Sequence, residues 1–386
     1  MLATDSSTKD LREAYKAQNL TLYLGAGVSV ANGLPTWNQL ILAMYFTAIS
    51  EERMEGWRPF PNYLYAIAEY QLKRSQEPLE IMARKIRKYY PTPSDFLENL
   101  RQTLYQGFSI EGAPSGHFQH FYKDNVLQAN PTLAAVSDLC LRKKPTAGVH
   151  SVITYNYDDL LEQVLDTTPH QPIFRQDQKL TEGLPIYHVH GYVPMGDSVG
   201  SPGEDIVFTE DQYHQSALDP YSWRNLVQVQ ALSRSVGLMV GLSLSDRNMR
   251  RFLDAVKRSP VRSKNFAILR KPRYQEPSDQ DLDQIHQKAI SYLKKFENSG
   301  IKASGHSREQ ALFSNPGIKA SHPILRGTPA IKGEPQYRRE IRGILQAVEQ
   351  FDAGEQAFVL EDLGITPIWY ESYSDIPAIL KSISTP

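Results

Sequence analysis

The sequence predicts an α/β protein built on a Rossmann-like, doubly wound parallel β-sheet. Short apolar segments bounded by glycine, proline and polar residues alternate along the chain with longer amphipathic stretches. Buried parallel strands form continuous apolar runs, and the helices between them cover the two faces of the sheet. A sheet of this kind binds ligands beyond the carboxyl ends of its strands. We therefore expect the functional residues in the turns that follow the strands.

The predicted strands are apolar segments rich in β-branched and aromatic residues. They lie at 20–24, 151–155, 185–189, 236–240, 265–270 and 364–370. Helices are predicted soon after several of these strands, at 158–165, 246–256 and 375–383.

A large helical insertion is predicted between the first strand and the second. Thr36 and Gln39 form a Thr-x-x-Gln capping box, which predicts a helix from this point to about Ile49. Aromatic and leucine spacing predicts further helices around 63–72, 79–89 and 96–105. We assign residues 38–148 to this insertion.

The sheet domain is then assembled from residues 1–37, 149–274 and 355–386. Residues 275–354 form a further region, with a helical segment followed by a long loop at 299–336 that is rich in Gly, Pro, Ser and Lys. Long loops in compact proteins are usually functional or ordered by a contact. We expect this region to contact another subunit or a partner.

Composition excludes several classes of function. The chain of 386 residues has 41% hydrophobic residues and a net charge of -1, so no direct nucleic-acid binding is expected. No apolar run reaches the length of about 18 residues that a membrane span needs, and the N-terminus lacks a signal sequence, so we expect a cytoplasmic protein. Cys140 is the single cysteine, which excludes an intrachain disulfide and a zinc site built on several thiolates.

The first strand ends in a glycine turn, Gly25-Ala26-Gly27. A strand that turns here into a short helix, ending near Gly33, presents backbone amides and a helix N-terminus that favour a phosphate group. The same residues also suit a tight turn without a ligand. Val30 stands where a hydride-transfer dinucleotide fold needs its third glycine, and the Gly-Lys-Ser/Thr of a P-loop is missing.

Asn156 and Asp158 follow the second predicted strand. Both residue types are common in turns and at helix N-termini, so a purely structural role remains open. A functional role is also chemically reasonable, because the neutral amide of Asn can orient a hydroxyl group or a water molecule.

His188 and His190 lie at the end of the third predicted strand, with Gly191 after them. Two histidines at this spacing could bind a metal, but no neighbouring carboxylate or thiol completes a site, and we expect none. A buried structural role is common for histidine. His190, beside Gly191, is better suited to proton transfer because its pKa lies near neutrality.

The fourth turn follows the strand at 236–240 and contains Gly241 and Ser243, with Asp246 predicted as a helix N-cap. Taken alone, it is an ordinary β–α turn. It adds a further turn of small residues at the same edge of the predicted sheet.

In order and identity, the four turns resemble the NAD-binding signature of the sirtuin fold. The matching segments are Gly25–Ser29 with Gly33–Pro35, Thr154–Asp158, His190–Gly191 and Gly241–Ser243. The resemblance implies a pyrophosphate and ribose site at Gly25, Ala26, Gly27 and Ser29, with Pro35 and Thr36 at the end of the same loop and Gly241 and Ser243 on the adenosine side.

The resemblance also implies a catalytic set. Asn156 and Asp158 would hold the nicotinamide ribose and a nearby water, and His190 would be the general base on a ribose hydroxyl.

Two features of the sirtuin protein deacylases are missing. The acidic-Phe-Arg gate after Gly-Ile-Pro is replaced by Thr36-Trp37-Asn38, and the four cysteines of the zinc ribbon are reduced to Cys140. The chain is in this respect similar to the sirtuin-like proteins of bacterial anti-phage defence. That similarity implies an NAD+ hydrolase that consumes NAD+ as its substrate, forms a homo-oligomer and works with a separate HerA-type hexameric ATPase.

Two other functions remain open. A sirtuin-type protein deacylase or ADP-ribosyltransferase would need an acyl-lysine channel, which the missing gate and cysteines disfavour. A non-catalytic sensor of NAD or a derivative would not require both Asn156 and His190.

Overall fold

The computed structural model divides the chain into two compact units, residues 1–270 with 360–386 and residues 271–359. The structure describes residues 5–53, 70, 74, 78–105, 123–141, 147–165, 168–181, 183–196, 199–244, 246–259, 263–272, 275–298 and 335–384.

The first unit is built on a seven-stranded sheet in which every neighbouring pair of strands is parallel. The predicted fold class is confirmed. The strand order is β3-β4-β2-β1-β5-β6-β7. The strands are β1 (Leu20–Leu24), β2 (Val149–Thr154), β3 (His170–Ile173), β4 (Leu184–His188), β5 (Val236–Val240), β6 (Asn265–Arg270) and β7 (Ile365–Tyr370).

The order of the strands reverses at β1. β2 and β4 follow on one side of β1, and β5, β6 and β7 follow on the other side. The switch point of the sheet therefore lies between β1 and β5, where open α/β sheets form a ligand crevice.

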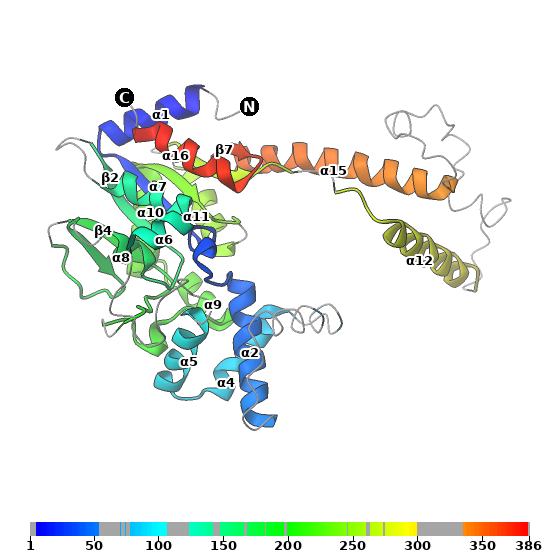
Figure 1. Cartoon of the computed structure of the whole chain (residues 1–386), viewed down its shortest axis with the longest axis horizontal. Helices are drawn as coiled ribbons and strands as arrows, with labels where there is room; N and C mark the ends of the chain where they lie inside the picture. The colour runs from blue at the N-terminus through cyan, green and yellow to red at the C-terminus, as the bar shows by residue number, and fades with distance from the viewer. Residues whose placement is uncertain are drawn as a thin grey trace. The chain divides into compact units, whose positions relative to one another are not determined.

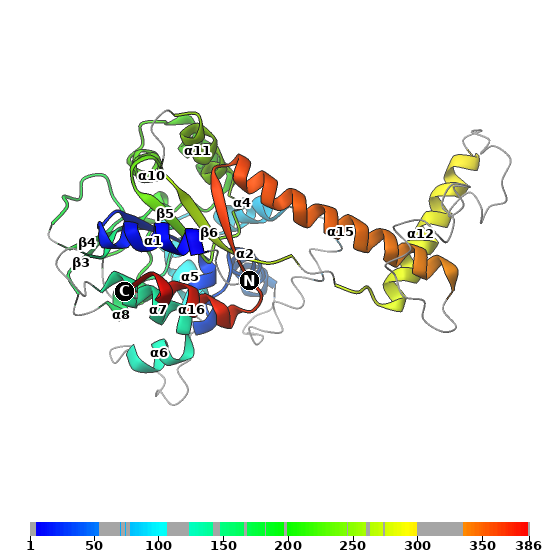
Figure 2. The same cartoon turned by 90° about the horizontal axis from the view of Figure 1, so that it is seen from above.

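Alternate side chains of each strand point to opposite faces of the sheet, and a hydrophobic core lies on each face. Leu22 belongs to the core that contains α1 (Asp5–Lys16), α7 (Pro131–Cys140) and α16 (Ile376–Ser384), whereas Tyr23 belongs to the core that contains α10 (Trp223–Arg234) and α11 (Arg247–Lys257). Figure 2 shows α10 and α11 on one side of the sheet and α7 and α16 on the other.

The helical insertion contains α2 (Trp37–Arg53), α4 (Leu79–Tyr89), α5 (Pro93–Tyr105) and α6 (Lys123–Ala129), followed by α7. Figure 1 shows α2, α4 and α5 grouped together. The predicted capping box is confirmed: the Thr36 amide donates to Gln39 Oε1 at 2.9 Å, and the Gln39 amide donates to Thr36 Oγ1 at 3.4 Å. The predicted helix at 79–89 is confirmed, whereas the one at 63–72 lies outside the described residues apart from Tyr70.

Three local elements differ from the prediction. The turn after β1 forms two short 3-10 helices, η1 (Ala26–Val28) and η2 (Val30–Asn32). The helix after β2 is only α8 (Leu160–Val164). Strand β3 was not predicted, because it is a short edge strand that contains Pro172 and has only one buried residue, Ile173. The remaining elements are α9 (Glu210–Leu218), η3 (Gly203–Asp205) and η4 (Tyr373–Asp375).

The second unit contains α12 (Asp279–Asn298) and most of α15 (Gln336–Asp362). Arg338 binds Asp283 at 2.7 Å, and the Tyr337 hydroxyl donates to the same carboxylate at 2.6 Å. The Tyr337 ring also stacks on His286. Of the loop predicted at 299–336, residues 299–334 lie outside the described residues. Among the helices that the structure describes, none is long and apolar enough to cross a membrane.

The turns after β1 and β5 touch each other through glycine backbone. The amide of Gly27 donates to the Gly241 carbonyl at 3.0 Å, and a Cβ at Gly27 would lie 2.8 Å from the Gly241 Cα. A Cβ at Gly25 would lie 2.6 Å from the Gly241 carbonyl oxygen. Glycine is therefore required at both positions for the two turns to approach this closely.

We expect Gly27→Ala to lower the free energy of unfolding by about 1–3 kcal/mol, because the added methyl group must displace backbone rather than a flexible side chain. Chemical denaturation of both proteins measures this change. Gly196→Ala is the matched control, since no heavy atom of the described residues, its chain neighbours aside, lies within 4 Å of its Cβ position. Equal stability of the two variants would contradict the proposed packing constraint.

Candidate functional site

The turns that follow β4, β2, β1 and β5 lie side by side, because these strands are neighbours in this order and are all parallel. Each turn carries residues that the sequence singles out. Ser29 follows β1, Asn156 follows β2, His190 follows β4 and Gly241 follows β5. The fold thus gathers the four predicted segments along the carboxyl edge of the sheet.

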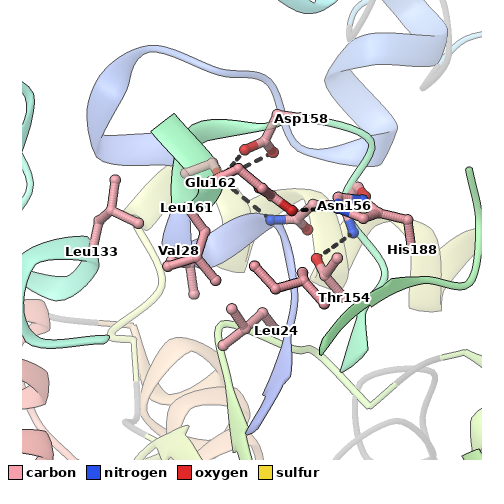
Figure 3. A pocket seen from close by; sticks show the side chains of 11 residues that line it. Leu24, Val28, Leu133, Thr154, Asn156, Asp158, Leu161, Glu162 and His188 are labelled. Atoms are coloured by element: carbon pink, nitrogen blue, oxygen red, sulfur yellow. Dashed lines mark hydrogen bonds and ion pairs between the residues drawn. The ribbon is translucent and has the colours of Figure 1, made fainter. Parts of the chain in front are cut away.

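A chain of hydrogen bonds joins the turn after β1 to the turn after β2. Asn156 Nδ2 donates to the Gly25 carbonyl at 3.1 Å and to Ser29 Oγ at 3.2 Å. Ser29 Oγ in turn lies 3.1 and 3.0 Å from the two carboxylate oxygens of Asp158 and donates to them. Figure 3 shows Asn156 and Asp158 beside each other in this arrangement. The structure therefore brings Ser29, Asn156 and Asp158 into one cluster.

Asp158 is buried, and burial raises the pKa of its carboxyl group to about 7. Hydrogen bonds from the Leu160 amide and the Ser29 hydroxyl favour the carboxylate and oppose this rise, whereas the neighbouring charges of Asp159 and Glu162 add to it. The carboxyl group consequently titrates close to neutral pH.

A small pocket lies against this cluster and has room for about one water molecule. Its polar lining comes from the turns after β1 and β2 and from the buried side chains beneath them. The lining residues are Leu24, Val28, Ser29, Leu133, Thr154, Asn156, Asp158, Leu161, Glu162, Ile186 and His188.

His188 is buried and hydrogen-bonded to protein atoms on both sides of its ring, which is the structural role that the sequence left open. Its Nε2 lies 2.6 Å from Glu162 Oε1, and its Nδ1 lies 3.3 Å from the Asn156 carbonyl oxygen. Both ring nitrogens are therefore engaged with protein atoms. Within the described parts of the chain, no group of three or more His, Cys, Asp or Glu side chains is arranged to hold a metal ion.

His190 does not line this pocket and lies in an aromatic environment of its own. Tyr155 and Tyr213 pack edge-on against its ring at centroid distances of 5.1 and 5.3 Å, and its Nε2 lies 3.9 Å from Asp246 Oδ2. Burial lowers the pKa of His190; the Asp246 carboxylate opposes this shift and the Arg224 cation adds to it. The lowered pKa favours a neutral imidazole that can accept a proton.

Most amide groups of the glycine turn already have backbone partners. Gly25 donates to the Val240 carbonyl and Gly27 to Gly241, while Val28 and Ser29 donate within the turn itself. Among the described residues, no partner accepts a hydrogen bond from the Ala26 amide. The glycines thus mainly allow the two turns to pack together. Of these amides, that of Ala26 is available to bind an anion.

The remaining predicted binding residues lie at the ends of their turns. Pro35 and Thr36 are partly exposed, and the Thr36 hydroxyl caps α2 through Gln39. Ser243 is exposed. Asp246 caps α11 as predicted, accepting from the Met249 amide at 2.8 Å.

The sequence did not identify Asn130 as a residue of this region. It is buried, and its Nδ2 donates to the Val28 carbonyl at 2.7 Å and to Asn32 Oδ1 at 2.6 Å. The helical insertion thereby contacts the turn after β1 through hydrogen bonds. The available signal was Asn followed by Pro131, which is typical of a helix N-terminus but does not reveal a distant contact.

Fold and site together define a Rossmann-like α/β domain whose polar residues converge beside a glycine turn at the switch point. Residues 150–293 match the SIR2-like domain family. The matched segment includes Asn156, Asp158, His190 and Gly241 and supports assignment to a sirtuin-like family. SIR2-like domains bind NAD+. No curated protein matches the chain.

We predict that Asp158→Asn flattens the pH dependence of stability between about pH 4 and 7. The pKa of Asp158 is raised from 3.8 to about 7 in the folded protein, so the folded state retains a proton that the unfolded state loses. Its contribution is therefore fully present below about pH 4 and is lost as pH rises through about 7. Asparagine does not titrate, so we expect the Tm difference between variant and wild type to shift by several degrees in favour of the variant from pH 5 to pH 8.

Thermal unfolding of wild type and variant across this pH range tests the prediction. Asp254→Asn changes the same chemical group at an exposed position of α11 and should leave the wild-type pH profile intact. Parallel pH profiles for wild type and Asp158→Asn would contradict the raised pKa.

Proposed function

We propose that this protein is an NAD+ hydrolase that cleaves the nicotinamide–ribose bond and releases nicotinamide and ADP-ribose. The observation that carries the proposal is the convergence of Asn156 and His190 on one edge of the sheet, beside the glycine turn, inside a segment that matches the SIR2-like domain family. A site for binding alone would need neither an anchored amide nor a neutral imidazole.

The reaction makes modest demands on the protein. The bond between the nicotinamide nitrogen and the ribose carbon breaks, and nicotinamide leaves as a neutral molecule because its ring is cationic in NAD+. A water oxygen then bonds to the ribose carbon, and one proton is released. The transition state resembles an oxocarbenium ion, so the protein must fix the ribose and place the water rather than protonate the leaving group.

Asn156 is suited to the orienting role. Its Nδ2 is held by the Gly25 carbonyl and Ser29 Oγ, which fixes the plane of the amide. No described residue donates a hydrogen bond to its Oδ1. We infer that this oxygen accepts a hydrogen bond from the attacking water or from a ribose hydroxyl, and that Asn156 acts mainly through orientation.

His190 is suited to proton transfer. Its lowered pKa favours the neutral form, and Asp246 lies 3.9 Å from Nε2, where it can stabilise the imidazolium that forms when His190 accepts a proton. We propose that His190 takes a proton from a ribose hydroxyl as the oxocarbenium ion forms and returns it after the water has added, and that Ser29 and Asp158 complete the ribose side of the site. A positioned base of this kind contributes about 10²–10⁴-fold to the rate.

We expect His190→Ala and Asn156→Ala to fold normally and to lose NAD+ cleavage by at least about 10²-fold. Chromatography of released nicotinamide measures the loss, and circular dichroism checks the fold. His214→Ala is the matched control, because its side chain on α9 is 62% exposed.

Full activity in both variants would contradict the assignment of these residues. Calorimetric binding of NAD+ by the wild type without any cleavage would favour the sensor function instead. Release of nicotinamide only when an acyl-lysine peptide is present would favour a deacylase.

We further propose that the hydrolase is an effector of bacterial anti-phage defence, acting by NAD+ depletion as a homo-oligomer together with a HerA-type hexameric ATPase. The resemblance of the four turns supports the role. The second unit supports self-association: Ile344, Phe351 and Phe358 recur at heptad spacing on α15, Val348 lies between the first two, and all four are exposed. A second copy of the same helix face is the partner that this spacing fits.

We expect mass photometry to show an oligomer for the wild type and a larger complex after addition of a HerA-type ATPase. Phe351→Glu should shift the protein toward the monomer, because it places a charge in the apolar stripe. Gln350→Glu adds the same charge at the adjacent exposed position and should leave the oligomer intact. A monomer under every condition would contradict the proposed assembly.

A further inference from the structure

Two buried ionisable side chains lie beneath Asn156 and have no role in the reaction described above. Glu162 projects from α8 and His188 from the end of β4, and their side chains are 7% and 1% exposed. Figure 3 shows both side chains in the pocket next to Asn156. Ionisable groups are rarely buried to this extent, and burying them costs folding free energy unless they are paired and hydrogen-bonded. A buried pair beside Asn156 is therefore a candidate for a functional role.

The partners of His188 determine where its protons lie. Nε2 faces the Glu162 carboxyl group at 2.6 Å, and Nδ1 faces the Asn156 carbonyl oxygen at 3.3 Å. A carbonyl oxygen only accepts hydrogen bonds, so Nδ1 carries a proton and donates it. A second proton lies between Nε2 and Oε1. The pair has the same net charge whether this proton belongs to the imidazole or to the carboxyl group.

The orientation of the imidazole ring is fixed from a third side. The ring of Tyr192 packs against it at a centroid distance of 4.5 Å. Glu162 holds one ring nitrogen and Tyr192 covers the ring, so Nδ1 is directed at the backbone of Asn156. In metal and catalytic sites, a carboxylate behind a histidine fixes the ring in the same manner.

The pair completes the restraint of Asn156. The amide of Asn156 donates to Thr154 Oγ1 at 3.1 Å, its carbonyl accepts from His188, and its Nδ2 is held by Gly25 and Ser29. Every polar atom of the residue is thereby tied to the protein except Oδ1. A displacement of about 1 Å at such a group can cost about 10²-fold in rate.

We propose that Glu162 and His188 form a positioning pair that aims Asn156 Oδ1 at the reacting ribose or water, without touching the substrate. The proposal rests on the proposed NAD+ hydrolase function and deepens it. It predicts that losing the Nδ1 donor lowers kcat while leaving KM and the affinity for NAD+ close to the wild-type values, because the groups that bind the rest of NAD+ are unchanged.

The test replaces the pair in two ways. The double variant His188→Leu with Glu162→Leu removes both buried ionisable groups together, so no unpaired charge remains and folding is preserved. His188→Asn, made in the same Glu162→Leu background so that no buried charge is left unpaired, instead retains a side-chain N–H close to the position of Nδ1. We expect kcat to fall about 10- to 100-fold in the double variant and to recover by at least a factor of three in His188→Asn.

His150→Leu serves as the control, because it makes the same substitution at an exposed position of β2. Wild-type kcat in the double variant, or equal losses in the double variant and in His188→Asn, would overturn the proposal. So would a loss that appears in KM with kcat unchanged. Thermal unfolding of each variant separates these outcomes from simple destabilisation.

Crystal structures of the double variant and of His188→Asn test the positioning directly and do not depend on activity. We expect the Asn156 carboxamide to be displaced or rotated in the double variant and to keep its wild-type orientation in His188→Asn. An unchanged Asn156 in the double variant would overturn the positioning role even if the wild type proves to be inactive on NAD+. Displacement together with an inactive wild type would retain the positioning role and reject the hydrolase.

Discussion

The contact between the glycine turns after β1 and β5 is the constraint on which the candidate site depends. Gly27 and Gly241 meet through backbone atoms at the switch point, where the two halves of the sheet diverge. Any side chain at Gly27 would separate the turns and move Ser29, which follows two residues later. The same glycine pattern that suggests phosphate binding is therefore first a requirement of packing, and the position of the polar cluster follows from it.

The polar cluster has a fixed geometry, and burying it lowers the folding stability of the protein. Burial raises the pKa of Asp158, so at neutral pH its charged form is less favourable than in water. Hydrogen bonds from Ser29 and Leu160 compensate only in part. A protein selected for stability alone would fill this position with an apolar side chain, whereas the proposed hydrolase would benefit from oxygen and nitrogen atoms held in place before the substrate arrives.

The sheet could be predicted from the sequence because its information is local. Apolar runs identified the strands, and the Thr36–Gln39 capping box identified the start of α2. Two features were missed for different reasons. Pro172 and the edge position hide strand β3. The packing of Tyr213 on His190 joins a helix to a turn that is remote in sequence. The turn residues could be identified from the sequence, but their hydrogen-bond partners are seen only in the folded structure.

Asn156 and His190 reach the same edge of the sheet with different chemical surroundings. Asn156 is tied by hydrogen bonds of its side chain and needs no change of charge to act, whereas His190 packs against aromatic rings and has a pKa that burial lowers. A reaction with a neutral leaving group needs one group to orient and one to accept a proton, but no strong acid. The placement of these two environments after the adjacent strands β2 and β4 therefore fits the separate orienting and proton-accepting roles in the proposed cleavage of NAD+.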